Sequence, residues 1–357
     1  MPARRPERNG KYFSALIELE QGNNFYFRRD YQNAVNSYTN AINIQPNFAE
    51  AYNNRGNAYV QLQNYSQALQ DLQNAARLNS VDSRIYNNLG NVYLMQQNYN
   101  SAIKAYSQAI NLNSNLFTAY FNRALAYSLL EQKDRAIQDL NTAIKLNPQY
   151  FDAYANLGLT YVTMENYKKA IPQFSKAIEI NPNFAEAYNN RGVAYYDLGQ
   201  KEIAIQDYNK AIQLNPNYDK AYYNRGNAYY DLGQYERAIA DYSKAIEVNP
   251  NYDYVYNNRG FTYQNLKQYE RAIQDYDKAI QLNPNFAVAY GNRGETYYYL
   301  KNYKQAFIDL NKAIELGLEG KDLGEALHYR GLCYQATGNN TKTQADFAKA
   351  KQLGYNG

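Results

Sequence analysis

The pattern Tyr-x-Asn-Arg-Gly-x-x-Tyr recurs along most of this 357-residue chain, in register with a period of 34 residues. It occurs, for example, at residues 52–59, 188–195, 222–229 and 290–297. A fixed period of this length is typical of stacked copies of one supersecondary unit, because a single copy cannot bury its own apolar face. The period therefore constrains the fold more strongly than any local propensity does.

Ten repeats fit this period. Their first residues are at positions 15, 49, 83, 117, 151, 185, 219, 253, 287 and 324. The spacing is 34 throughout except for the last, which is 37 and includes a glycine-bearing loop at residues 316–321. We expect residues 1–14 to form a short basic tail and the start of a capping helix. Residues 15–353 are then one repeat domain, and residues 354–357 are a C-terminal tail.

Aromatic and small residues recur at helical spacing in two parts of each repeat. Position 8, counted from the first residue of a repeat, is glycine in nine repeats, and position 27 is alanine in all ten. Small side chains on facing helices let them approach closely, and proline at position 32 of six repeats ends the second helix. Each repeat is thus predicted to be an antiparallel helix hairpin. Pro172 lies within a predicted second helix and is expected to bend it or to open a turn.

These features resemble the tetratricopeptide repeat (TPR) family, whose 34-residue pattern places aromatic, small and proline residues at the same positions. The resemblance includes the TPR arm of O-GlcNAc transferase and bacterial TPR proteins. It implies an all-α fold, an α-solenoid built as a right-handed superhelix of antiparallel helix hairpins. It also implies a concave groove that is lined mainly by the first helices.

Arginine at position 7 always occurs together with aspartate at position 23 of the same repeat. An ion pair joining the two helices of a repeat would explain this, so we interpret these arginines as structural and not as anion-binding groups. The seven predicted pairs are Arg55 and Asp71, Arg123 and Asp139, Arg191 and Asp207, Arg225 and Asp241, Arg259 and Asp275, Arg293 and Asp309, and Arg330 and Asp346.

Asparagine fills position 6 in eight successive repeats, although it is a poor helix former. The eight residues are Asn54, Asn88, Asn122, Asn156, Asn190, Asn224, Asn258 and Asn292. One carboxamide in each repeat could bind the backbone of an extended peptide, which is similar to the asparagine ladder of O-GlcNAc transferase and kinesin light chain. Alternatively, these side chains merely form hydrogen bonds with neighbouring helices.

Other positions on the expected groove change character along the chain. In repeats 3 to 5 they are apolar, which favours an interaction site; the residues are Leu94, Met95, Phe121, Leu125, Leu129, Leu159 and Val162. In later repeats they are aromatic and acidic, and the predicted contacts there are Tyr196, Asp197, Tyr230 and Asp231. Seven carboxylates against two cations at these positions favour a partner with apolar and basic character.

Several other classes of function find little support in the sequence. His328 and Cys333 are the single histidine and the single cysteine, so we predict no catalytic residue, no metal site and no cofactor. A net charge of +4 without a basic stripe argues against nucleic acid, and no apolar run is long enough to enter a membrane. Co-chaperone TPR modules hold the C-terminal carboxylates of Hsp70 or Hsp90 in a clamp that includes lysine at position 5 and arginine at position 6. No repeat here has either residue at these positions, so we do not expect these C-terminal tails as partners.

The sequence therefore predicts a non-enzymatic scaffold that binds an extended or helical segment of another protein in its groove, with cytoplasmic localisation as the default. Two alternatives stay open, a substrate-recruiting arm of a glycosyltransferase acting in trans and an assembly factor for a membrane or photosynthetic complex. Self-association through the exposed end of repeat 10 is a further alternative.

Overall fold

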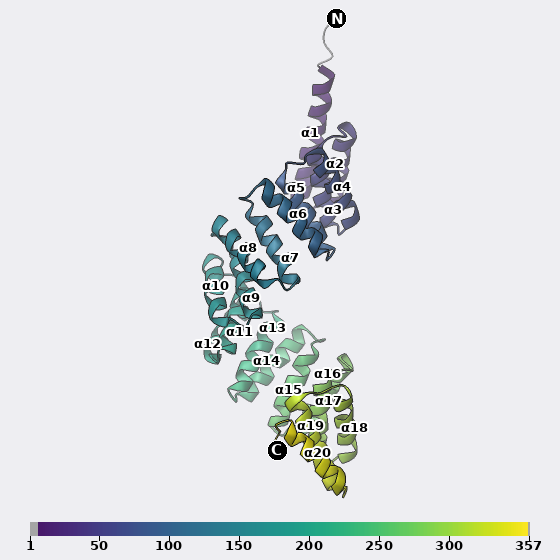
Figure 1. Cartoon of the computed structure of the whole chain (residues 1–357), viewed down its shortest axis with the longest axis vertical. Helices are drawn as coiled ribbons and strands as arrows, with labels where there is room; N and C mark the ends of the chain where they lie inside the picture. Colours follow the sequence, from purple (N-terminus) through teal and green to yellow (C-terminus); the bar gives the residue numbers. More distant parts are fainter. Residues whose placement is uncertain (1–5, 356–357) are drawn as a thin grey trace. The chain divides into compact units, whose positions relative to one another are not determined.

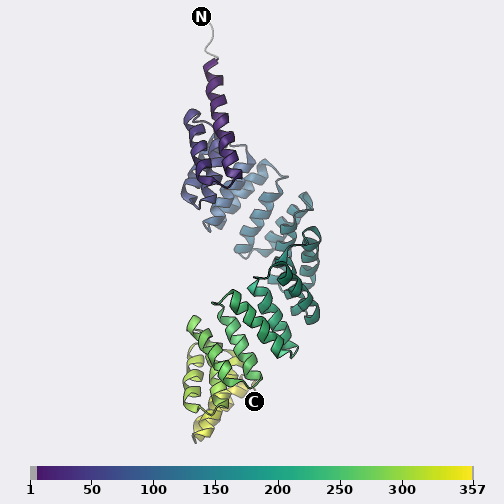
Figure 2. The same ribbon diagram turned by 180° about the vertical axis from the view of Figure 1, so that it is seen from behind.

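The computed structural model describes residues 6–355, and this part of the chain is helical with no strand. It divides into two compact parts, residues 1–182 and residues 183–357, which we call the N-terminal and the C-terminal block. Figures 1 and 2 show that within each block the helices follow one another as hairpins stacked in chain order. The prediction of an all-α repeat architecture is thereby confirmed.

Each repeat contributes one pair of helices. The N-terminal block holds α1 (Pro6–Phe27), α2 (Tyr31–Ile44), α3 (Ala49–Gln61), α4 (Tyr65–Leu78), α5 (Ser83–Met95), α6 (Tyr99–Leu112), α7 (Phe117–Leu129), α8 (Lys133–Leu146), α9 (Phe151–Thr163) and α10 (Tyr167–Ile180). The C-terminal block holds α11 (Ala185–Asp197), α12 (Lys201–Leu214), α13 (Asp219–Asp231), α14 (Tyr235–Val248), α15 (Asp253–Asn265), α16 (Tyr269–Leu282), α17 (Ala287–Tyr299), α18 (Tyr303–Glu315), α19 (Gly320–Ala336) and α20 (Asn340–Gln352).

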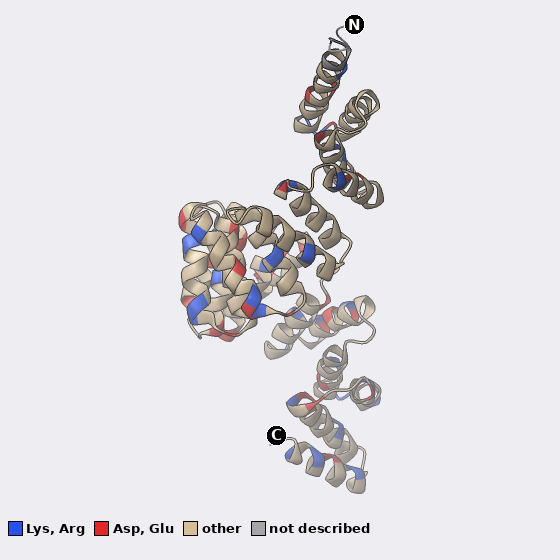
Figure 3. Cartoon of the chain, turned by 45° about the horizontal axis from the view of Figure 1, so that its top comes forward, with Lys and Arg blue, Asp and Glu red and all other residues tan. Residues whose placement is uncertain are grey.

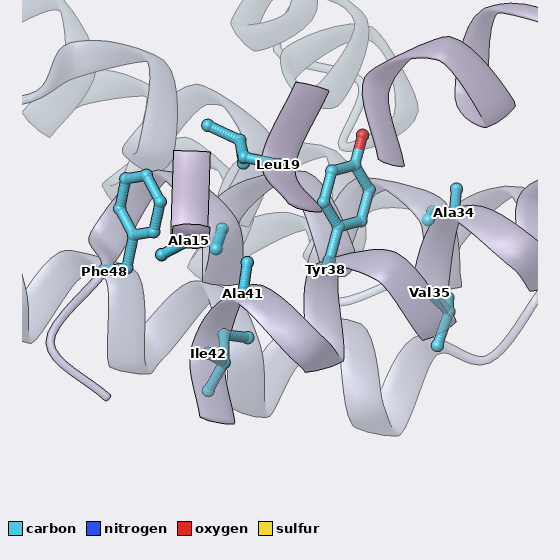
Figure 4. Close-up of a cluster of buried hydrophobic side chains, with 10 residues drawn as sticks. Ala15, Leu19, Ala34, Val35, Tyr38, Ala41, Ile42 and Phe48 are labelled. Atoms are coloured by element: carbon cyan, nitrogen blue, oxygen red, sulfur yellow. The ribbon is translucent and has the colours of Figure 1, made fainter. Parts of the chain in front are cut away.

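The core of each hairpin is built from alanines and one large side chain on the second helix. Ala34 and Ala41 of α2 are fully buried, and Tyr38 lies between them with 1% of its surface exposed. Figure 4 shows Tyr38 and these alanines grouped with Ala15, Leu19 and Phe48. The same arrangement repeats along the chain because the residue types at positions 20, 24 and 27 repeat.

Glycine at position 8 is required by the large side chain at position 24. A Cβ atom placed on Gly226 would lie 2.7 Å from Cε1 of the buried Tyr242, closer than carbon atoms approach. In repeat 4 the large ring is replaced by Leu140, and there Ala124 takes the place of glycine. Leucine at position 24 also occurs with glycine at position 8, as Leu72 with Gly56 and Leu310 with Gly294, so repeat 4 is the one repeat in which an alanine is accommodated there.

The packed structure extends beyond residues 15–353, the range assigned to the repeat domain. Helix α1 begins at Pro6 and has 22 residues, so residues 6–14 lie in the helix whose start was expected within residues 1–14. At the other end, the ring of Tyr355 lies 5.1 Å from that of His328, so this residue packs on α19. The rest of the predicted tails, residues 1–5 and 356–357, lies outside the described residues.

Pro172 does not open a turn, because α10 continues through it from Tyr167 to Ile180. Its side chain lies on the exposed side of the helix. A proline lacks the N–H group that would bond to the preceding turn, and its placement on the solvent side lets water satisfy the carbonyl left over.

Candidate functional site

The asparagines at position 6 lie on the first helix of each repeat, and all eight are half-buried. In six of them the amide nitrogen donates a hydrogen bond to the first helix of the preceding repeat. Asn54, Asn122 and Asn258 donate to an asparagine at position 9 of the preceding repeat, over 3.0 to 3.2 Å. Asn88, Asn224 and Asn292 donate to an asparagine at position 5 of the preceding repeat, over 2.9 to 3.0 Å.

Two positions of the series depart from this pattern. Repeats 4 and 5 carry no asparagine at position 5 or 9, so the following carboxamides have no such acceptor on the preceding repeat. Asn156 instead donates to the backbone carbonyl of Asp152 in its own helix, over 2.9 Å. Asn190 accepts a hydrogen bond from Asn189, over 3.1 Å. The position-6 residues thus use their donors mainly within the protein, as the alternative interpretation of the sequence supposed.

A tyrosine from the second helix joins this network in three repeats. The hydroxyls of Tyr38, Tyr106 and Tyr242 each donate to the position-9 asparagine of the same repeat, over 2.8 Å. These three acceptors are Asn23, Asn91 and Asn227, and each also accepts the bond from position 6 of the following repeat. These residues were not predicted, although asparagine at position 9 and tyrosine at position 24 occur together in repeats 1, 3 and 7.

Two pockets open beside this network, one in each block. The pocket of about 240 Å³ in the C-terminal block is lined by Asn227, Tyr196, Tyr230, Asp231 and Phe261, among others. The pocket of about 180 Å³ in the N-terminal block lies at the corresponding positions of repeats 1 and 2, and its lining includes Asn23, Tyr26, Phe27, Tyr38 and Asn54.

Most of the predicted apolar residues of repeats 3 to 5 are accessible. Met95 and Leu129 are each 55% exposed and Leu159 is 39% exposed, while Leu94, Leu125 and Val162 are half-buried. Met164, which was not predicted, adds a further 42% exposed side chain.

Phe121 is a correction to the predicted set. Only 8% of its surface is exposed, because its ring packs edge-on against Tyr150 with the ring centroids 4.9 Å apart. It therefore supports the surface from beneath and does not lie on it.

Three of the predicted contacts at the C-terminal ends of α11 and α13, namely Tyr196, Tyr230 and Asp231, line one pocket. The Tyr196 hydroxyl donates to Asp231 over 2.7 Å, and the ammonium group of Lys201 lies 3.2 Å from the same carboxylate. Burial raises the pKa of Tyr196, and the bond to Asp231 raises it further. Asp231 already has a cationic partner, so this part of the surface is less acidic than the residue types suggested. Figure 3 likewise shows acidic and basic residues mixed along the helices.

The structure brings each of the seven arginine–aspartate pairs together. In Arg55 and Asp71, for example, Nε and Nη2 donate to the two carboxylate oxygens over 2.7 and 2.8 Å. The same bidentate geometry occurs in the other six pairs. Burial acts to lower the pKa of Arg55, but the bonds and the charge of Asp71 outweigh it and raise the pKa above its ordinary value.

The third nitrogen of these arginines reaches the preceding repeat, which the sequence analysis did not anticipate. Nη1 of Arg55 donates to Thr39 over 2.9 Å and Nη1 of Arg123 donates to Ser107 over 2.9 Å. The corresponding acceptors in later repeats are Asn209, Ser243, Asp277 and Asn311, all at position 25. Each such guanidinium therefore joins three helices. The polar residue types at position 25 were the available signal.

Glu295 of repeat 9 is one of the seven carboxylates counted at the expected groove positions, but it is buried. Glu295 is 7% exposed and accepts hydrogen bonds from Tyr329, Gln264 and Tyr299. Burial raises its pKa, and these bonds act in the opposite direction. A small cavity beside it is also lined by Glu325 and other residues of α17 and α19.

The single histidine and the single cysteine show no catalytic arrangement in the described structure. Cys333 is fully buried, and burial raises its pKa to about 11. His328 packs against the rings of Phe347 and Tyr355. Within residues 6–355 no three His, Cys, Asp or Glu side chains are placed to hold a metal ion. Every helix in that range is too short or too polar to cross a bilayer.

Family profiles match the sequence over most of its length. A profile described as TPR repeat matches residues 22–63, 56–97, 90–131, 129–165, 161–199 and 226–267. Two further profiles, each described as tetratricopeptide repeat, match residues 185–218 and 254–286, and residues 207–240 and 275–307. The first profile alone covers more than half of the chain.

The chain is also similar to solved structures. A tetratricopeptide repeat protein from Parabacteroides merdae is 25% identical, with a TM-score of 0.55 over 69% of this chain and 97% of that one. The pilF protein of Pseudomonas aeruginosa is 22% identical, with a TM-score of 0.52 over 57% and 91%. YrrB, described as a TPR protein with an unusual peptide-binding site, is 26% identical, with a TM-score of 0.44 over 51% and 93%. No curated protein matched the sequence.

Proposed function

Because the chain belongs to the tetratricopeptide repeat family, we propose that it is a non-enzymatic scaffold that binds a segment of a partner protein along its first helices. The segment is extended or helical and carries apolar and basic side chains. The observation that carries this proposal is the row of accessible apolar residues Met95, Leu129 and Leu159 on three successive first helices.

These side chains would be costly to leave in water unless they serve a contact. Burying a large apolar side chain contributes roughly 1.5–3 kcal/mol, so a segment covering three of them could bind with useful affinity. Contiguous exposed apolar residues in a soluble chain commonly mark an interaction site. The half-buried carboxamides nearby add polar groups that fix the orientation of a partner.

The test starts by capturing partners with the full chain and identifying them by mass spectrometry. Affinity is then measured by calorimetry with the purified partner and with Leu129→Glu, which places a charge in the apolar row without disturbing a buried residue. We expect at least a tenfold loss, because each good apolar contact is worth about 1.4 kcal/mol or more.

Val81→Glu is the matched control, since Val81 is 74% exposed but lies in the loop between α4 and α5. It should leave the affinity unchanged. Equal affinity of the Leu129→Glu protein and the unchanged protein would remove the apolar row from the binding surface.

Replacing Asn122, Asn156 and Asn190 together with alanine tests the asparagine ladder as a peptide-binding element. If the ladder binds the partner, this triple variant should bind the partner more weakly while its helix content is unchanged. A glycosyltransferase acting in trans, or subunits of a membrane complex, would appear among the captured proteins if either alternative is correct.

A further inference from the structure

We infer that Asn23, Asn91 and Asn227 are the carboxamides that bind the partner, through main-chain carbonyl oxygens of an extended peptide. This inference rests on the proposed function and assigns the contact to position 9 of the repeats, while the position-6 asparagines of the following repeats serve to orient it. None of these three residues belongs to the predicted set of binding residues.

Two donors hold the oxygen of each of these carboxamides in place. The oxygen of Asn91 accepts from the hydroxyl of Tyr106 over 2.8 Å and from the amide of Asn122 over 3.0 Å. Tyr106 is fully buried, so its hydroxyl requires an acceptor, and that fixes the oxygen of Asn91 toward the core. The amide nitrogen of Asn91 then lies on the opposite branch of the planar group, facing away from both donors.

The N–H groups of these three carboxamides are not used within the protein. The Nδ2 atoms of Asn23, Asn91 and Asn227 donate no hydrogen bond to any residue that the structure describes, and no buried polar atom there lacks a partner. The three side chains are half-buried, so their amide hydrogens face solvent at the accessible side of the network. Each therefore offers two N–H donors to an acceptor that comes from outside.

By contrast, the position-6 groups are already engaged. Asn258 donates to Asn227 over 3.2 Å and to the hydroxyl of Tyr223 over 3.3 Å, and its own oxygen accepts from Asn257. A partner would have to break these bonds to use Asn258, whereas Asn227 can bind without any rearrangement.

The position-9 asparagine with its tyrosine and position-6 partners occurs twice with a pocket beside it. Asn23 and Asn227 both line such pockets, at equivalent positions of repeats in the two blocks. Tyr26 and Tyr230, at position 12, form a wall in each case. The corresponding neighbours of Asn91 are Leu94 and the 55% exposed Met95. The two N–H groups of the position-9 carboxamide can bind a peptide carbonyl. The apolar or aromatic residue at position 12 can then contact an apolar side chain that follows this carbonyl in the peptide.

The ligand should be a neutral carbonyl group and not a carboxylate. Neither pocket is lined by lysine or arginine, and the Asp231 carboxylate beside Asn227 is already paired with Lys201, so neither lining offers a cation to an anionic ligand. A main-chain carbonyl has the required acceptor lone pairs without the charge.

The experiment uses the full chain and a phage-displayed library of random 12-residue peptides. The tightest peptide is synthesised, and its affinity is measured for the unchanged protein and for Asn91→Asp and Asn227→Asp. An aspartate keeps the oxygen that accepts from tyrosine and from position 6, so the fold is retained, but it replaces the free donors with an acceptor. We expect at least one of the two variants to bind roughly tenfold to a hundredfold more weakly.

Gln96→Glu is the control, because it adds the same charge at an exposed residue at the end of α5, and it should bind the peptide within about twofold of the unchanged protein. Asn156→Ala is the competing arm of the test, because it removes a position-6 amide that orients no position-9 residue. Weaker binding by Asn156→Ala together with full binding by both aspartate variants would overturn the inference in favour of the position-6 ladder.

A change in the peptide tests the same contact without altering the protein. Ester groups replace the peptide bonds one at a time, which weakens each carbonyl as an acceptor. At least one ester should reduce affinity by roughly threefold to tenfold. If no ester and neither aspartate variant reduces binding, the inference fails while the proposed function stands. A library that yields no binding peptide would overturn both.

Discussion

Removing the aspartate of a single arginine–aspartate pair should destabilise its repeat more than removing both partners. Arg123 and Asp139 of repeat 4 are suited to the test, since the aspartate is 4% exposed and the arginine side chain is 17% exposed. The change Asp139→Ala deletes two hydrogen bonds of 2.7 and 2.8 Å and leaves a guanidinium in a largely buried site. Breaking a buried pair in this way costs about 3–5 kcal/mol.

The lower end of that range applies here. Arg123 retains its bond of 2.9 Å to Ser107, and the rings of Tyr120 and Tyr127 lie 5.6 and 5.8 Å from the guanidinium carbon. It also keeps some contact with water, so we expect the single change to cost about 3 kcal/mol.

The double change Arg123→Leu with Asp139→Ala copies a pair that the chain itself contains. Repeat 3 has Leu89 and Ala105 at these positions, and both are buried in its core. Replacing a buried pair by apolar residues is often neutral, so the double variant should lose about 1 kcal/mol or less. The two changes are thus expected to be strongly non-additive.

Hydrogen exchange followed by mass spectrometry on α7 and α8 is the appropriate assay. A repeat array opens locally, and exchange reports the free energy of that opening where a whole-chain melting curve would not. Asp134→Ala, on the exposed side of α8, is the control and should change it by less than about 0.5 kcal/mol. A double variant as unstable as the single one, or a single variant within about 1 kcal/mol of the unchanged protein, would refute the reasoning.

Three further predictions concern packing, pH and thiol chemistry. Gly226→Ala should cost about 1–3 kcal/mol in local exchange because its Cβ would meet Tyr242, and adding Tyr242→Leu, which copies Ala124 over Leu140, should recover part of the loss; no recovery would show that ring size is not the cause. The raised pKa of Glu295 means that the folded protein retains a proton which the unfolded chain releases near pH 4.5, so its contribution to stability is present at low pH and is lost as pH rises through the raised value. Glu295→Gln should therefore raise the free energy of local opening of α17, measured by hydrogen exchange, more at pH 7 than at pH 4, and an equal change at both would contradict this. Cys333, with its pKa raised to about 11, should react with a disulfide reagent at pH 8 only after denaturation, and rapid reaction of the native protein would disprove its burial.

The periodic pattern was sufficient to predict most helix starts. Helices α3, α5, α7 and α9 begin at residues 49, 83, 117 and 151, the first residues set by the period. The ends were less predictable, because α1 and α19 have no repeat partner on one side to fix their length, and α1 extends to Pro6. The residues that pair across a hairpin could be inferred because Arg and Asp always occur together within a repeat.

The partners of the asparagines could not be inferred in the same way. Each position-6 carboxamide bonds to whatever acceptor the preceding repeat offers, which is Asn23 for Asn54 but Asn53 for Asn88. In repeat 1 the acceptor Asn23 also accepts from Tyr38, whereas repeat 2, with Asn53 and Asn57 both available, has Leu72 in place of that tyrosine. Counting one position at a time hides this dependence, since it involves three positions in two repeats.

The arginine that reaches back to the preceding repeat has a mechanical consequence. Within the N-terminal block the repeats headed by Arg55 and Arg123 are tied to their predecessors through the side chains of Thr39 and Ser107. The repeats with Leu89 and Leu157 have no such tie. If the two ends of the block are pulled apart, the junctions in front of these leucines should part first, so that its repeats separate two at a time.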